Sequence, residues 1–175
     1  MRSFVASTLT LALASAVLAA PAPSSPAAAA AATSAKFQLR AFSDAGLTGW
    51  ALVNAHAGAA TNSVQIQRPS AYQSDVSHLD GTSLVFDLNS VFTPYTLRVP
   101  AVPAGAVAHV TVQVGQGTEG FALTADNHLS FNGAVSGWWA CPVNNTFELF
   151  YGPNPDPANL PSTECQAIEL VAGFV

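Results

Sequence analysis

Residues 108–114, Ala-His-Val-Thr-Val-Gln-Val, decide the fold class of this chain. Apolar side chains occupy every second position from Ala108 to Val114, and polar side chains such as His109 and Gln113 lie between them. Successive side chains of an extended strand point to opposite faces, so this alternation predicts a strand with one buried and one solvated face. No comparable helical periodicity is found after residue 36.

Shorter segments with strand-like patterns recur along the rest of the chain. They are residues 37–41, 50–54, 63–67, 84–88, 95–99, 120–124, 128–131, 137–141, 147–151 and 165–171. Asp80-Gly81 and Asn132-Gly133 favour tight reversals between them, and Asp126-Asn127 suits a two-residue hairpin. Many short strands at such spacing predict an all-β fold, an antiparallel sandwich or barrel of short strands; the sequence leaves these two architectures open.

The N-terminus has the layout of a secretory signal peptide. A basic start at Arg2 precedes the apolar run 4–18, and small residues allow cleavage between Ala19 and Ala20. The run is too short for a membrane span. We therefore predict a signal peptide over 1–19, a flexible leader rich in Ala, Pro and Ser over 20–35, and a single folded domain over 36–175, secreted from the cell.

The composition excludes some classes of partner. Half of the residues are hydrophobic, only 9% are charged, and the net charge is −5. Binding to nucleic acid or to an anionic membrane surface needs clustered Lys and Arg, and none cluster here. A weakly charged chain rich in Thr, Ser, Asn, Gln and Gly fits an extracellular surface that faces neutral polysaccharide.

Two modifications are expected in an exported chain. Cys141 and Cys165 are the two cysteines, so they form one disulfide, worth about 3 kcal/mol in the loop-entropy model. A metal site is disfavoured because no Cys-x-x-Cys or Cys/His spacing is present. Asn144-Asn145-Thr146 is an acceptor sequence for an N-linked glycan, which makes Asn144 the glycosylation candidate.

Tryptophans are the candidates for binding a ligand. Trp50, Trp138 and Trp139, with Tyr151, provide the aromatic faces and polar edges that stack on sugars. Trp138 and Trp139 are neighbours on a predicted strand and point to opposite faces, so one of them belongs to the core.

No catalytic motif, metal or cofactor is predicted. We expect the histidine side chains to be solvated; they are His56, His78, His109 and His128. Only His78 has a possible partner close in the sequence, the carboxylate of Asp80. A glycosidase needs two facing carboxylates. The available ones are Glu119, Glu148, Glu164, Glu169, Asp87 and Asp126. No motif pairs them, and the alternation around Glu148 and Glu169 directs both to solvent. The Gly-x-Ser-x-Gly motif of serine hydrolases is absent.

In four places the chain resembles fungal secreted cell-wall proteins of the PhiA type. These are residues 37–42 (FQLRAF), 121–131 (FALTADNHLSF), 139–142 (WACP) with the strand 147–151, and Cys165 with its closing strand. The resemblance implies a β-rich, wall-associated protein, in that family linked to the development of spore-bearing cells and to surface antigens. It implies no catalytic residue, and only the cysteine pair carries over. Residues 59–79 and 91–105 depart from the pattern, and the extra cysteines of some relatives are absent.

These observations predict a secreted structural or surface protein of a fungal cell wall, without enzymatic activity, whose partners are wall polysaccharide or wall proteins. A carbohydrate-binding module or lectin is the first alternative. A small secreted hydrolase is the second.

Overall fold

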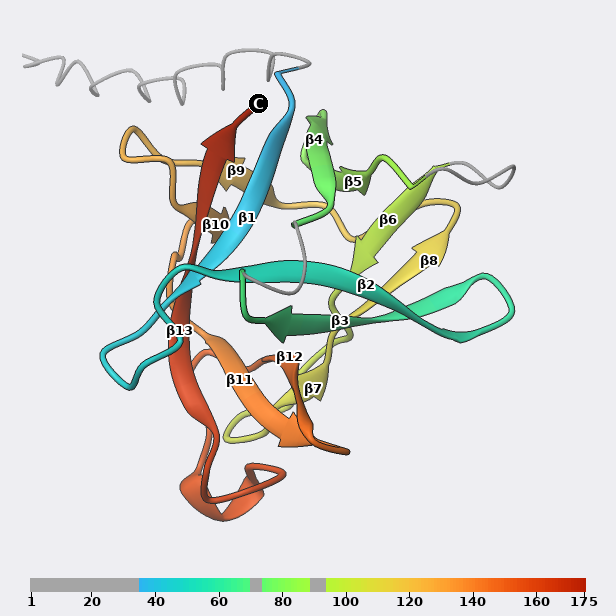
Figure 1. The fold of residues 1–175 in the computed structure, drawn as a ribbon. Coiled ribbons are helices and arrows are strands. Elements are labelled where there is room, and N and C mark those ends of the chain that lie inside the picture. Colours follow the sequence, from blue (N-terminus) through green and yellow to red (C-terminus); the bar gives the residue numbers. More distant parts are fainter. Residues whose placement is uncertain (1–34, 70–73, 89–93) are drawn as a thin grey trace, which may run out of the picture.

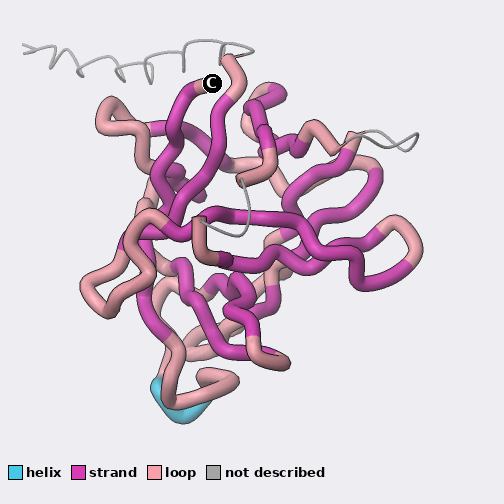
Figure 2. The backbone as a smooth tube through the Cα atoms, in the orientation of Figure 1, coloured by secondary structure: helices cyan, strands magenta, loops and turns pink. Residues whose placement is uncertain are grey.

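The computed structural model describes residues 35–69, 74–88 and 94–175. Strands dominate this part of the chain, and one short 3-10 turn, η1 (Pro157–Asn159), lies in the last long loop (Figure 2). The strands are β1 (Phe37–Phe42), β2 (Trp50–Gly58), β3 (Thr61–Gln67), β4 (Val76–Asp80), β5 (Ser83–Phe86), β6 (Tyr95–Arg98), β7 (Ala108–His109), β8 (Thr111–Val114), β9 (Phe121–Leu123), β10 (Leu129–Phe131), β11 (Trp138–Val143), β12 (Thr146–Tyr151) and β13 (Gln166–Phe174). The predicted signal peptide, 1–19, lies outside the described residues, as does the leader up to residue 34.

Nine antiparallel strands close into a barrel, in the order β1-β4-β5-β6-β8-β3-β12-β11-β13 and back to β1. The prediction of an all-β antiparallel fold is therefore confirmed, and of the two architectures left open the barrel is the one formed. β2 pairs with both β1 and β3, and β7 pairs with β12. The end of the chain lies beside the start of β1, where Phe37 pairs with Phe174 (Figure 1).

The core follows from the alternation in the strands. In β1 and β13 every second side chain points inward, and Leu39 and Leu170 are fully buried. Leu52, Ile66 and Leu149 fill the core from β2, β3 and β12. Burying each such side chain stabilises the fold by roughly 1.5–3 kcal/mol, so the barrel interior is the main source of stability.

A separate two-stranded hairpin, β9–β10, completes an aromatic cluster. Phe121 and Phe131 from this hairpin pack with Trp138 and Tyr151, with ring centroids 4.9–6.4 Å apart. Trp138 has no exposed surface. The cluster attaches the hairpin to β11 and β12, so residues that the chain separates widely form one core.

The predicted disulfide joins Cys141 to Cys165. β11 and β13 pair in the register Trp138↔Ile168 to Ala140↔Gln166, and the two cysteines are the next opposed positions. Their Cα atoms are 4.1 Å apart. The bridge thus continues the β11–β13 pairing covalently where the hydrogen-bonded ladder ends.

The predicted strand over 108–114 is wrong as a single element. It divides at Val110 into β7, which pairs with β12, and β8, which pairs with β3 and β6. The inward alternation survives, because Val110 and Val112 are fully buried. The chain therefore keeps its buried face while it changes partner strands.

Other differences concern β4 and the turns. β4 was not predicted, because its central residues Ser77 and His78 give it too little apolar character. The reversal at Asn132-Gly133 is confirmed, with φ of 51° and 81°. The Asp126-Asn127 hairpin also forms, but with a three-residue loop, because Thr124 bonds to the carbonyl of His128. In the described part of the chain, no helix is long and apolar enough to cross a membrane.

Trp138→Ala removes the largest side chain of the aromatic cluster. We expect the free energy of unfolding to fall by about 3–5 kcal/mol, because a cavity remains where the indole packed. Denaturant unfolding followed by circular dichroism measures this loss. The neighbouring Trp139→Ala is the matched control and costs much less; equal losses would contradict the core position of Trp138.

Cys165→Ser removes the disulfide. We expect a loss of about 2–5 kcal/mol in the free energy of unfolding, since the unfolded chain is then no longer cross-linked. The same loss on reducing the wild-type protein is the control. Two thiols that react with an alkylating agent in the native protein would show that the bridge does not form.

Candidate functional site

The three candidate tryptophans lie in three different environments. Trp138, predicted as a ligand-binding residue, is wholly buried and cannot stack on a ligand, so that assignment is wrong. The expectation that one of the pair Trp138 and Trp139 belongs to the core is confirmed. Trp50 and Trp139 are partly exposed but line separate grooves, so they form no common platform.

The groove beside Trp139 combines an aromatic ring with polar walls. Its volume is about 450 Å³. It is lined by Phe42, Ser43, Asp44, Thr48, Ser136, Gly137, Trp139, Pro153, Ala167, Ile168 and Glu169. Residues from β1, β11, β13 and three loops thus meet at one place on the barrel surface.

The Trp139 ring is held in position. Its indole Nε1 donates a hydrogen bond to the carbonyl of Gly152, 3.0 Å away. The residue paired with Trp139 on β13 is the small Ala167, which leaves space above the strand. At Gly137, φ is +100° and a Cβ would lie 2.9 Å from the Tyr151 ring, so only glycine permits the close approach at this edge.

One wall of the groove is the loop between β1 and β2. Ser43 and Thr48 bind each other twice: the Thr48 hydroxyl donates to the Ser43 carbonyl (2.7 Å) and accepts from the Ser43 amide (3.2 Å). Leu47 anchors the loop in the core. Because this loop is already ordered, the protein loses little conformational entropy there when a ligand binds.

Glu169, the β13 partner of Phe42, also lines the groove, and a histidine contacts its carboxylate. Its Oε2 lies 2.9 Å from Nδ1 of His128, which precedes β10. The second carboxylate of the groove is the exposed Asp44. No Lys or Arg is among the lining residues, so the groove favours a neutral, hydroxyl-bearing ligand over a phosphate or sulfate.

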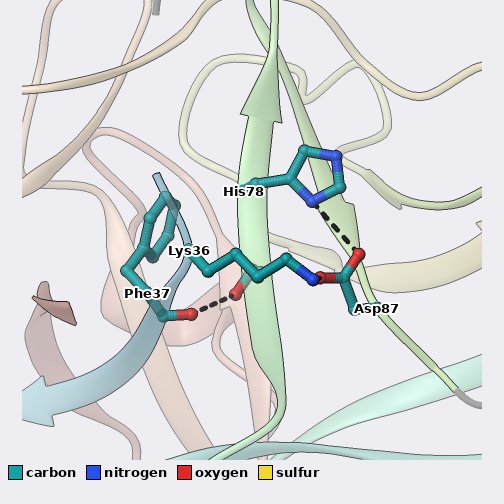
Figure 3. A network of polar contacts seen from close by, with 5 residues as sticks. Lys36, Phe37, His78 and Asp87 are labelled. Carbon is teal, nitrogen blue, oxygen red and sulfur yellow. Dashed lines mark hydrogen bonds and ion pairs between the residues drawn. The ribbon is translucent and has the colours of Figure 1, made fainter. Parts of the chain in front are cut away.

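A second histidine–carboxylate contact lies near the start of β1. Asp87 lies between Lys36 (Nζ–Oδ2 2.9 Å) and His78 (Nδ1–Oδ1 3.2 Å), as Figure 3 shows. Beside them the Ser77 hydroxyl donates to the carbonyl of Phe37. The partner of His78 is therefore Asp87. The local spacing in the sequence suggested Asp80 instead, and that prediction is wrong. These contacts tie β1 to β4 and serve the fold.

His109 and Glu148 form the third pair, in which Nε2 of His109 lies 2.8 Å from Oε2 of Glu148. The Glu148 side chain is only 14% exposed, so the prediction that it faces solvent is wrong. His109 on β7 covers it, since β7 takes the place of β3 beside β12 at Phe150 and Tyr151, where β3 turns away to pair with β8. The solvated assignment holds for His56, which is exposed.

No local sequence pattern joins the parts of the groove, so it was not predicted. The turn-like composition of Ser43-Asp44-Ala45-Gly46 marked a loop, but nothing placed that loop beside Trp139. Three histidine–carboxylate contacts also went unseen, because each joins different strands. Among the described residues, no group of three or more His, Cys, Asp or Glu side chains is placed to hold a metal ion.

The glycosylation candidate Asn144 lies at the tip of the β11–β12 hairpin. Asn144 and Asn145 form its two-residue turn, with φ of 49° and 66°, and both are exposed. The Thr146 hydroxyl donates to the carbonyl of Val143 at 3.0 Å. The acceptor residue is thus at the surface.

The class of protein defined by this structure is an antiparallel β-barrel with one disulfide and a shallow groove of aromatic, hydroxyl and carboxylate groups. A family model described as "Domain of unknown function (DUF7907)" matches residues 34–174, and the chain belongs to this family. No curated protein and no solved structure matches the chain. The match spans the whole barrel, from before β1 to the end of β13.

Burial raises the pKa of the Tyr151 hydroxyl above its ordinary value of 10.0. The neutral phenol is favoured in the folded state, so this contribution to stability is complete below pH 10 and is lost as the pH rises through the folded-state value. We expect unfolding to become easier with alkali, and Tyr151→Phe to weaken this dependence. Unfolding at several pH values from 8 to 12 measures it; an unchanged slope in the variant would contradict it.

Proposed function

We propose that this protein is a secreted, non-enzymatic component of a fungal cell wall or cell surface, and that it holds neutral wall polysaccharide in the Trp139 groove. The signal-like N-terminus and the resemblance to PhiA-type proteins support secretion and wall association. The groove supports the choice of partner.

The observation that carries the proposal is the exposed part of Trp139 beside fixed polar groups. A sugar ring offers an apolar face of C–H groups, which packs on an indole, and a rim of hydroxyls, which need donors and acceptors. Ser43, Thr48 and Ser136 provide hydroxyls, and Asp44 and Glu169 provide acceptors, on the walls around the ring. An open groove also suits a chain that continues beyond the contacted residues.

A small secreted hydrolase is the second candidate, favoured by one observation. Asp44 and Glu169 line the same groove, and hydrolysis of a glycosidic bond uses two carboxylates. The Glu169 carboxylate is held by His128 and is about half exposed, at 46%. These surroundings resemble those of a hydrogen-bond acceptor more than those of a buried acid. We therefore favour binding of a polysaccharide over its hydrolysis.

Retention on insoluble chitin, β-glucan and mannan tests the proposal. We expect the secreted protein to bind at least one of them, and Trp139→Ala to weaken binding about tenfold, the equivalent of one lost stacking contact. Trp50→Ala is the matched control on β-glucan and mannan, because it removes an equally large, partly exposed ring outside the groove.

The supernatant of the same experiment is assayed for released sugar. Binding without release supports the proposal. Release that is lost in Asp44→Asn or Glu169→Gln would establish the hydrolase instead. Absence of both binding and release would contradict the polysaccharide partner and direct the search to wall proteins.

A further inference from the structure

A second groove, about 380 Å³ in volume, lies beside Trp50 and plays no part in the proposed polysaccharide contact. It is lined by Trp50, Ile66, Gln67, Arg68, Asn145, Thr146 and Phe147. Two of these, Asn145 and Thr146, are the residues that follow Asn144 in the glycan acceptor sequence.

The floor of this groove is aromatic and its geometry is defined. The rings of Trp50 and Phe147 meet edge to face, with centroids 6.0 Å apart and planes at 83°. Phe147 is placed there because it pairs with Ile66 on β3, and Trp50 because β2 starts beside Gln67 and Arg68. Both rings pack on the core and remain partly exposed.

Polar groups lie at the rim of this floor. The guanidinium carbon of Arg68 lies 5.3 Å from the centre of the Trp50 ring, a cation–π distance, and Arg68 itself is exposed. Gln67, Asn145 and Thr146 add amide and hydroxyl groups. An apolar floor with donors at its edge matches an N-acetylated sugar, which has C–H faces, hydroxyls and an amide carbonyl.

We propose that the Trp50 groove is the seat of the first sugar of an N-linked glycan on Asn144. A covalently attached N-acetylglucosamine is delivered to the groove by the hairpin turn, because Asn144 directly precedes the lining residues Asn145 and Thr146. The positive φ of Asn144 and Asn145 keeps this turn tight and limits the positions that the sugar can reach. The glycan therefore packs on Trp50 and Phe147 and stabilises the β2–β3–β12 junction. This inference rests on secretion, as proposed above, but not on the Trp139 groove.

The test compares the full chain secreted by a glycosylating eukaryotic host with the identical chain made without glycosylation. Intact mass reports whether Asn144 is modified, with Asn144→Asp as the unmodified control, because Asp also tolerates a positive φ. An endoglycosidase that leaves a single N-acetylglucosamine then isolates the effect of the first sugar. We expect this single sugar to raise the Tm by about 2–4 °C.

A double-mutant comparison assigns the gain to the groove. Trp50→Ala abolishes the Tm difference between glycosylated and unglycosylated chains, whereas Trp139→Ala leaves it unchanged. Arg68→Ala, an exposed position, reduces the difference and answers the same question if Trp50→Ala does not fold.

Two results would overturn the inference: secreted protein without a glycan on Asn144, or an equal gain with and without the Trp50 ring. Neither result affects the polysaccharide proposal, since retention on polysaccharide depends on Trp139, which lies outside the Trp50 groove. Conversely, loss of retention alone leaves the glycan result standing.

Discussion

One edge of β1 forms its hydrogen bonds with two different strands, and the rest of the structure depends on this constraint. One edge of this strand pairs with β13 over its whole length. The other edge pairs with β4 at Phe37 and Gln38 and with β2 at Arg40 and Ala41. β3 divides its edge in the same way, between β8 at Thr61–Ser63 and β12 at Gln65 and Ile66. These two branch points join strands from both ends of the chain into a closed barrel, which removes most free sheet edges.

Closure explains where the polar contacts lie. The contact of Lys36 and His78 with Asp87 braces the first branch, where β4 leaves β1. The contact of His109 with Glu148 lies next to the second, where β7 replaces β3 as the partner of β12. A strand that changes partners leaves side chains near the junction without neighbours, and a histidine–carboxylate contact fills that position.

The two grooves also arise from closure, and they differ in what they offer. The Trp139 groove lies where the β1–β2 loop approaches β11 and β13, and its carboxylates suit hydroxyl donors. The Trp50 groove lies where β2, β3 and β12 meet, and its cation and aromatic floor suit an N-acetylated sugar. Both are shallow and open, which suits the extended and covalently attached saccharides that we propose as their partners. Membership of the DUF7907 family covers the whole barrel and so does not distinguish one groove from the other.

Local physics in the sequence determined much of this protein. Alternation predicted most strands, Asn132-Gly133 predicted its own turn, and an even number of cysteines, in a chain predicted to be exported, predicted the bridge between Cys141 and Cys165. Adjacency on a strand also separated Trp138 from Trp139, although not which ring would be buried. Tertiary structure decided the rest, because it depends on contacts between residues far apart in the chain. The split of 108–114 at Val110, the burial of Glu148 under His109, and the meeting of Asp44 with Glu169 around Trp139 all follow from the order in which strands pair. Short-range patterns carry no information about that order.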